Sequence, residues 1–497
     1  MINKYAGKGS GSSRARPGLA TSNEICSLKA TDMARMIRQK KLSAREVMEA
    51  HLREIERVNP RVNAIVTLVP EDQLMAQAQA ADEATVRGER LGPLHGLPVG
   101  VKDNHQTDGI GTTWGSILYR DHVPDFDCLL VEREKRAGAI VIGKTNLPEF
   151  GLGSQTFNRV FGPTLNPYDV KKTCGGSSGG SAVALACGMV PIADGSDLGG
   201  SLRNPASFCN VVGLRTSPGR VPSGPSPLGW STLGVDGPMA RNVADCALLL
   251  SALAGFDRRS PISIDQLGDR FANRLAGRRF KGVRVAMMKD LGLPWEPAVK
   301  EAVADQRKIF ESLGCIVEEA EPDLREANEC FLAWRHWQFE LQFADSLEAN
   351  PDKFNPYIHW HVEEGRKLTG PYLSRIERKR TALYQRMREF MDRYEFFILP
   401  VNQVLPFDVE TPYPNQIDGI KMENYLAWMK SAYYISTVGN PAISVPCAFS
   451  EMNLPIGIQI VGRHNDDWGV LQMAYAFEQS TNVGGRRPMG ITEPGEK

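Results

Sequence analysis

Apolar residues follow two patterns along the chain, one typical of helices and one of buried strands. Between Ser43 and Val58 they recur at helical spacing, and Ser43 with Glu46 forms a capping box, which predicts a helix that ends at the Asn59–Pro60 turn. Helical patterns also predict helices at residues 73–87, 128–137, 296–313, 373–393 and 469–479. Short apolar runs predict strands at residues 62–68, 99–101, 139–142, 283–288, 315–318, 396–399, 442–446 and 456–461, the third ending at Gly143. This order of elements predicts an α/β fold with a mixed, largely parallel central sheet covered by helices on both faces.

Residues 326–372 have a helical pattern and an unusual number of aromatic side chains. These are Phe331, Trp334, Trp337, Phe339, Trp360 and Tyr372. Two interpretations stay open. The segment either forms a helical layer that packs on the sheet, or forms a cap whose rings line a binding pocket.

Composition narrows the class of protein. The 58 basic and 58 acidic residues cancel, so no net charge attracts a nucleic acid. The nine cysteines are scattered without metal-site spacing, and no long apolar run predicts a membrane span. Residues 1–25 are rich in Gly, Ser and Arg without an apolar signal region, which predicts a disordered tail. We expect a cytoplasmic protein without nucleic-acid or membrane partners, acting as a monomer or homodimer on a small molecule.

Two Gly/Ser-rich segments carry the candidate chemistry. The first, residues 175–180, reads GGSSGG, and the second, residues 197–201, reads DLGGS. Glycine allows the sharp backbone turns that each segment needs. The second segment also places consecutive backbone N–H groups beside Ser201, an arrangement that suits a nucleophile next to an oxyanion hole.

These segments, together with Lys102 at the end of a short apolar run, resemble the amidase signature family. The family has a GGSSGG segment, a D-x-GGS-[IL]-R segment downstream and an earlier lysine before an aspartate. Here they are residues 175–180, residues 197–203 and the Lys102–Asp103 pair, and weaker similarity extends over residues 26–485. The resemblance implies a single amidase signature domain at residues 26–497, with no metal or organic cofactor.

The resemblance implies catalytic roles for three side chains. Ser201 would be the nucleophile, Ser177 a proton relay and Lys102 the base. A serine hydroxyl attacks only when a neighbour takes its proton, and a lysine can take it only when neutral, so burial must lower the lysine pKa from its usual value of about 10.4. The family also places a cis peptide bond between Gly176 and Ser177.

Backbone N–H groups and three supporting side chains complete the implied site. The oxyanion would bind the N–H groups of Leu198, Gly199, Gly200 and Ser201. The supporting side chains are Ser178, Asp197 and Arg203. We expect Asp197 and Arg203 to pair and to hold the turn that carries Ser201.

The pocket walls decide the substrate, since the nucleophile contacts only a carbonyl group. Family members cleave linear amides, and some cleave carbamates or esters. We expect the walls to include Gly151, Gln155, Arg220 and Gln403, in addition to the aromatic segment. Arg220 and Gln403 would suit a second oxygen such as that of a carbamate, and the chain is also similar to bacterial members that cleave urethanes.

Two alternatives stay open from the sequence. The first is the glutamine-hydrolysing amidotransferase subunit of the same family, which shares the catalytic motifs. The second is an α/β-hydrolase in which Ser177 lies in a G-x-S-x-G elbow and acts with a histidine, for which His359, His361 and His464 are the candidates.

Overall fold

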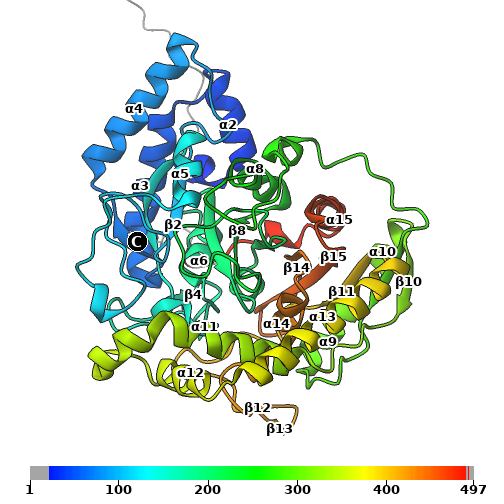
Figure 1. The fold of residues 1–497 in the computed structure, drawn as a ribbon. Coiled ribbons are helices and arrows are strands. Elements are labelled where there is room, and N and C mark those ends of the chain that lie inside the picture. Colours follow the sequence, from blue (N-terminus) through cyan, green and yellow to red (C-terminus); the bar gives the residue numbers. More distant parts are fainter. Residues whose placement is uncertain (1–21, 489–490, 492–497) are drawn as a thin grey trace, which may run out of the picture.

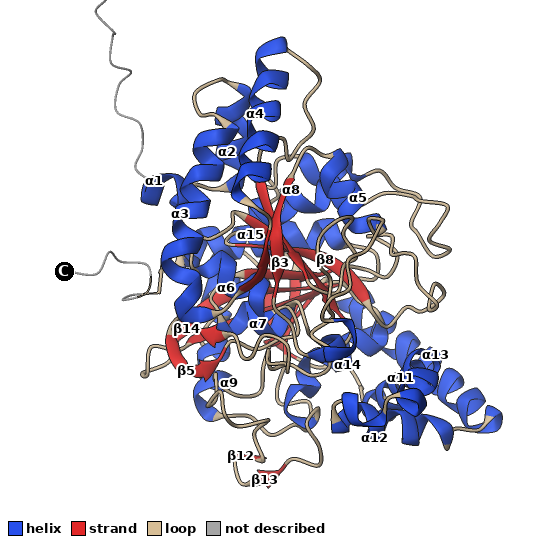
Figure 2. Cartoon of the chain, turned by 90° about the vertical axis from the view of Figure 1, so that its left-hand side faces the viewer, coloured by secondary structure: helices blue, strands red, loops and turns tan. Residues whose placement is uncertain are grey.

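One mixed sheet of eleven strands runs through the protein (Figures 1 and 2), in the order β1-β3-β2-β6-β8-β7-β14-β15-β11-β9-β10. The computed structural model describes residues 22–488 and 491. The strands are β1 (Ile65–Leu68), β2 (Pro98–Lys102), β3 (Ile140–Thr145), β6 (Ile192–Asp197), β7 (Val212–Arg215), β8 (Val235–Ala240), β9 (Arg284–Met287), β10 (Ile316–Glu319), β11 (Phe396–Pro400), β14 (Ala442–Phe449) and β15 (Pro455–Gly462). Two small hairpins join β4 (Leu165–Asn166) to β5 (Asp169–Thr173) and β12 (Gln416–Ile417) to β13 (Ile420–Lys421).

The sheet is mixed, as predicted, but it is not largely parallel. Only four neighbouring pairs are parallel, namely β2–β3, β2–β6, β9–β10 and β9–β11. The six other neighbouring pairs are antiparallel and include every pair in the centre, from β6 to β11. The short connection between β14 and β15 forms a hairpin, and hairpins make antiparallel pairs. Strand β3 also continues past Gly143, the predicted end, and pairs with β2 as far as Thr145.

Helices cover both faces of the sheet, which confirms that part of the prediction (Figure 2). The α-helices of the described residues are α1 (Ser22–Ser27), α2 (Ala30–Arg38), α3 (Ala44–Val62), α4 (Glu71–Arg87), α5 (Leu129–Arg136), α6 (Gly179–Ala186), α7 (Arg203–Phe208), α8 (Val243–Leu253), α9 (Pro297–Ala304), α10 (Arg307–Ser312), α11 (Ala327–Ala349), α12 (Pro356–Arg366), α13 (Gly370–Arg393), α14 (Lys430–Val438) and α15 (Asp467–Thr481). Side chains alternate across β3: Ile140 and Ile142 pack in the cluster that contains α6, whereas Val141 packs in the cluster that contains α5 and α8.

Most predicted helices differ from the observed ones by one to three residues at an end, and three differences are larger or change an element. The capping box at Ser43 and Glu46 is present, but α3 continues through Pro60 to Val62 and ends at Asn63, which has a left-handed backbone. The predicted helix 296–313 is two helices, α9 and α10. Of the predicted tail, residues 1–21 lie outside the described residues, and residues 22–25 instead begin α1, where Ile25 is buried in the core.

The aromatic segment forms α11, α12 and the start of α13, which lie together along one side of the molecule (bottom of Figure 1). Phe331 of α11 stacks on Tyr433 of α14, with ring centres 4.2 Å apart. The segment therefore packs as a layer, and one of its predicted aromatic side chains, Phe339 of α11, also lines the cavity described below. Within residues 22–488 and 491, no helix combines the length and apolarity needed to cross a membrane.

Candidate active site

Lys102 ends strand β2 and is completely buried. Its backbone N–H donates to Asp194 Oδ1 at 2.8 Å, which fixes the end of the strand against β6. Its Nζ lies 2.7 Å from Ser177 Oγ and 2.9 Å from Ser196 Oγ. Burial lowers the pKa of Lys102 to about 7, although the nearby carboxylates of Asp194, Asp236 and Asp197 act in the opposite direction. The amine can therefore be neutral near pH 7 and accept a proton.

Ser177 lies in the turn that precedes α6. The Gly176–Ser177 peptide bond is cis, as the family resemblance implies. Ser178 N–H donates to the backbone oxygen of Ser201 at 3.1 Å, so the two Gly/Ser segments are hydrogen-bonded to each other. Ser178 Oγ also accepts the N–H of Ser196 at 3.3 Å. The turn therefore places Ser177, the predicted proton relay, beside Lys102 and beside the segment that carries Ser201.

Asp197 holds the turn that carries Ser201. Its carboxylate accepts the N–H of Gly200 at 2.9 Å and that of Leu202 at 3.1 Å. It also pairs with Arg203 at 2.9 Å, as predicted, and with Arg215 at 3.1 Å. Burial opposes ionisation of this carboxyl, but the two guanidinium groups outweigh burial and hold its pKa well below the usual range. The turn is thus built on a permanent buried carboxylate.

Gly200 is required by this turn. Its backbone has φ of +120°, and a Cβ there would lie 2.6 Å from Asn204 Nδ2 and 2.7 Å from Ala432 Cβ. Because Asp197 already accepts the Gly200 N–H, that group does not point freely at an oxyanion. Gly200 is therefore removed from the predicted set of donors, whereas the N–H groups of Leu198, Gly199 and Ser201 make no hydrogen bond within the described residues.

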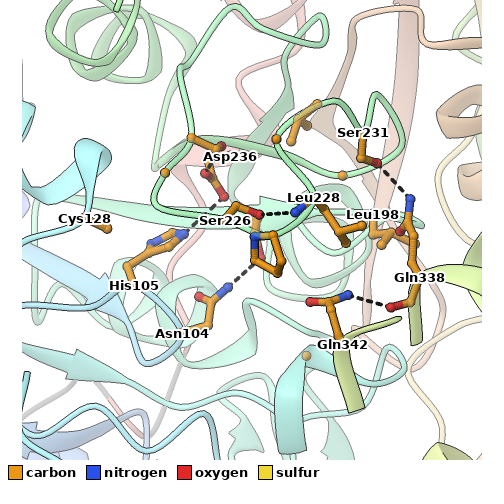
Figure 3. A pocket seen from close by; sticks show the side chains of 18 of the residues that line it. Asn104, His105, Cys128, Leu198, Ser226, Leu228, Ser231, Asp236, Gln338 and Gln342 are labelled. Carbon is orange, nitrogen blue, oxygen red and sulfur yellow. Dashed lines mark hydrogen bonds and ion pairs between the residues drawn. The ribbon is translucent and has the colours of Figure 1, made fainter. Parts of the chain in front are cut away.

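A cavity of about 480 Å³ opens onto Ser177 and Ser201. Leu198 and Gly151 also line it, and a Cβ on Gly151, where φ is +71°, would lie 3.3 Å from Ser177 Oγ. In Figure 3, His105 and Asp236 point toward each other on one side of the cavity, and Gln338 and Gln342 of α11 lie on the other side. A volume of this size suits a small organic substrate. The arrangement thus places two serines in the wall of a substrate-sized cavity, with the buried Lys102 hydrogen-bonded to one of them.

Of the four residues predicted to bind substrate, only Gly151 lines this cavity. Arg220 is not brought there, because it pairs with Asp467 and also donates to Gln266 and to a backbone oxygen. Gln403 donates to a backbone oxygen at 3.0 Å and accepts a backbone N–H at 2.8 Å. Gln155 donates to the backbone oxygen of Val409 at 2.7 Å. These three side chains support loops and do not form pocket walls.

His105 and Ser196 belong to the site, although no sequence motif singled them out. His105 lies between two carboxylates, 2.9 Å from Asp194 and 3.2 Å from Asp236. Burial alone lowers its pKa, but the carboxylates outweigh burial and raise it to about 9, so the ring is charged at neutral pH. The sequence could have indicated that Asp194 and Ser196 lie on the same face of the sheet. They are two residues apart on strand β6, and successive side chains of a strand point to opposite faces.

None of the three candidate histidines of the α/β-hydrolase alternative bonds to Ser177. His359 bonds to the backbone oxygen of Pro351, and His464 packs on the ring of Tyr384. His361 bonds to His336, Tyr425 and Arg335. Ser177 Oγ instead bonds to Lys102, which contradicts the alternative. Across residues 22–488 and 491, no group of three or more His, Cys, Asp or Glu side chains could hold a metal ion.

Comparisons with known proteins identify the family to which the chain belongs. A family model described as Amidase matches residues 46–471. An acylamidase from Rhodococcus erythropolis is 34% identical over 456 residues, which cover 91% of this chain and 95% of the relative. A glutamyl-tRNA(Gln) amidotransferase subunit from Alkaliphilus metalliredigens is 34% identical over 476 residues, which cover 90% of this chain and 94% of the relative.

Solved structures show the same fold. A bacterial aryl acylamidase of the amidase signature family superposes with a TM-score of 0.86 at 26% identity, and the match covers 93% of this chain and 99% of the other. The protein described here belongs to the amidase signature family. It is therefore a hydrolase that acts on carbon–nitrogen bonds.

Proposed function

We propose that the protein hydrolyses small amides through an acyl-enzyme on Ser201, with Ser177 and Lys102 as a proton relay. The observation that carries the proposal is the 2.7 Å contact between Lys102 Nζ and Ser177 Oγ, together with the cavity that both Ser177 and Ser201 line. The pKa of Lys102, lowered to about 7, supports its role as the base.

The proposed reaction has two halves. Ser201 Oγ attacks the carbonyl carbon and gives its proton to Ser177 Oγ, which gives its own proton to Lys102 Nζ. The resulting oxyanion accepts hydrogen bonds from the N–H groups of Leu198, Gly199 and Ser201. When the C–N bond breaks, the proton returns through Ser177 to the leaving nitrogen. Water then attacks the acyl carbon by the same relay, which releases the acid and restores Ser201.

We place amides first among the substrates. The relatives named acylamidase and aryl acylamidase support this choice. Carbamates and esters present a similar carbonyl carbon to Ser201, and we include them as secondary substrates. The case for a dedicated carbamate site is weaker, because Arg220 and Gln403 bind protein groups elsewhere.

A glutaminase role within an amidotransferase is the second candidate, supported by the amidotransferase relatives at 34% identity. Glutamine carries an ammonium group that needs an anionic partner. The cavity carboxylates Asp197 and Asp236 are already paired, with Arg203 and His105 respectively. This pairing favours substrates without an ammonium group.

One experiment separates these activities. Aniline release is measured from a simple N-aryl amide and from its matched N-aryl carbamate, and ammonia release is measured from glutamine. We expect the amide to react fastest, Ser201→Ala to abolish turnover and His464→Ala to leave it unchanged. Hydrolysis of glutamine alone would overturn the amidase proposal, and turnover by Ser201→Ala would overturn the mechanism.

A further inference from the structure

Arg335 of α11 is a buried cation in the wall of the cavity. It is only 5% exposed. Its Nε donates to His361 Nε2 at 3.1 Å, and its Nη2 donates to the Tyr425 hydroxyl at 3.2 Å. Its guanidinium carbon lies 4.6 Å from the centre of the Phe339 ring. These contacts fix the guanidinium plane without neutralising it.

No carboxylate in the part of the chain that the structure describes forms an ion pair with Arg335. Burial, chiefly, holds the pKa of His361 well below 6.5 and raises the pKa of Tyr425, so both hydrogen-bond partners are neutral. Among the described residues Arg335 forms no ion pair, and its Nη1 makes no hydrogen bond. A guanidinium removed from water without a counter-ion is costly, and such a group is well suited to bind an anion from the cavity.

The neighbours of Arg335 hold it in one orientation. His361 Nδ1 lies 2.9 Å from His336 Nδ1, and His361 Nε2 lies 2.6 Å from the Tyr425 hydroxyl. A neutral His361 that donates from Nδ1 to His336 shares the single lone pair of Nε2 between the Tyr425 hydroxyl, at 2.6 Å, and Arg335 Nε, at 3.1 Å. A guanidinium positioned beforehand loses less side-chain entropy when it binds a carboxylate.

The face of α11 that carries Arg335 has a mixed character. Arg335, Gln338, Phe339, Gln342 and Phe343 all line the cavity, and their spacing puts them on one helical face. Gln338 donates to Ser231 Oγ at 2.8 Å across the cavity wall. The wall thus offers two rings, two amides and one cation. This combination fits an organic molecule with an apolar body and an anionic end.

We propose that Arg335 binds a carboxylate of the substrate, so that the preferred substrates are amides with a carboxylate remote from the scissile bond. The proposal rests on the proposed amide hydrolysis and adds the substrate class. A carboxylate without a neighbouring ammonium group fits best, since the cavity carboxylates Asp197 and Asp236 already have cationic partners. Planar, paired hydrogen bonds from arginine suit such a group.

The test uses two matched pairs of amides, which place the carboxylate on either side of the scissile bond. On the acyl side are the para-nitroanilide of glutaric acid and its analogue with a methyl ketone in place of the carboxylate. On the leaving-group side are para-acetamidobenzoate and para-acetylacetanilide. The wild type should prefer the charged member of one pair by about 10- to 100-fold in kcat/KM. The pair that shows the preference identifies the side on which the carboxylate lies.

Variants assign the preference to Arg335. Arg335→Gln should remove it mainly through KM, lowering kcat/KM for the charged amides by a much larger factor than for the neutral amides, and Arg335→Lys should restore part of it. Arg386→Gln is the matched control, because Arg386 pairs with the partly exposed Glu326 and does not line the cavity. In the Ser201→Ala background, Arg335→Gln should also weaken calorimetric binding of the glutaric anilide.

The outcomes separate this proposal from the proposed function. Equal turnover of charged and neutral amides by the wild type would overturn the carboxylate site and leave the amidase intact. Equal losses on charged and neutral amides in Arg335→Gln would show a structural role only. Turnover by Ser201→Ala would instead overturn the mechanism while leaving the binding measurement to decide the role of Arg335.

Discussion

Replacing Lys102 with methionine should abolish the turnover of amides and change how stability depends on pH. Burial lowers the pKa of Lys102 from 10.5 to about 7. Between these two pH values the unfolded chain binds a proton that the folded protein does not. The unfolding free energy is therefore highest above pH 10.5 and falls as the pH drops toward 7. The whole effect is about 5 kcal/mol, because one pKa unit corresponds to about 1.36 kcal/mol.

Methionine has a similar length and no charge, so the variant lacks this pH dependence. From about pH 8.5 to about pH 6.5, the unfolding free energy of the variant should rise by about 2 kcal/mol relative to the wild type. Urea unfolding of both proteins across this range measures the difference. Replacing the exposed Lys308 with methionine is the control and should give no such trend. A difference that stays constant with pH, or shrinks on acidification, would refute the assignment of Lys102 as a buried neutral base.

Three other substitutions test the electrostatics and the turn. His105→Gln should move the acidic limb of the kcat/KM profile to higher pH. The two carboxylates beside His105 would then raise the pKa of Lys102 without a neighbouring cation to offset them. An unchanged profile would contradict this role. Gly200→Ala should lower kcat by at least about 100-fold, while the circular dichroism spectrum stays that of the folded protein. The added methyl group would lie 2.6 and 2.7 Å from neighbouring atoms and would displace the oxyanion donors. Near-normal activity would refute this. Arg215→Met should cost about 3–5 kcal/mol in urea unfolding, because it leaves Asp197 with one cationic partner fewer, and a loss below about 1 kcal/mol would contradict the account.

The sequence predicts those parts of the site that depend on local backbone. The turns around Ser177 and Ser201 need glycine at fixed positions, and Lys102 follows directly from the apolar run of β2. For this reason the motifs predict that Lys102 and Ser177 lie in contact, even though the two residues are 75 positions apart in the sequence.

The predictions that failed depend on partners distant in the sequence. Arg220 is held by Asp467, 247 positions away, and no local pattern indicates that pairing. The predicted strand directions failed for the same reason. An apolar run predicts a strand but does not predict which strand lies beside it, and the central strands are antiparallel. The position of Arg335 in the cavity wall likewise depends on the packing of α11, which no local sequence pattern predicts.

The most direct test of the account is to locate the acyl group during turnover. The protein is mixed with an activated acetyl ester, quenched in acid within the first turnover, digested and mapped by mass spectrometry. We predict one acetyl group on Ser201 in the wild type, and slower formation of the same adduct in Ser177→Ala and Lys102→Met. An acetyl group on Ser177, or unchanged turnover after Ser201→Ala, would contradict the claim that Ser201 is the nucleophile.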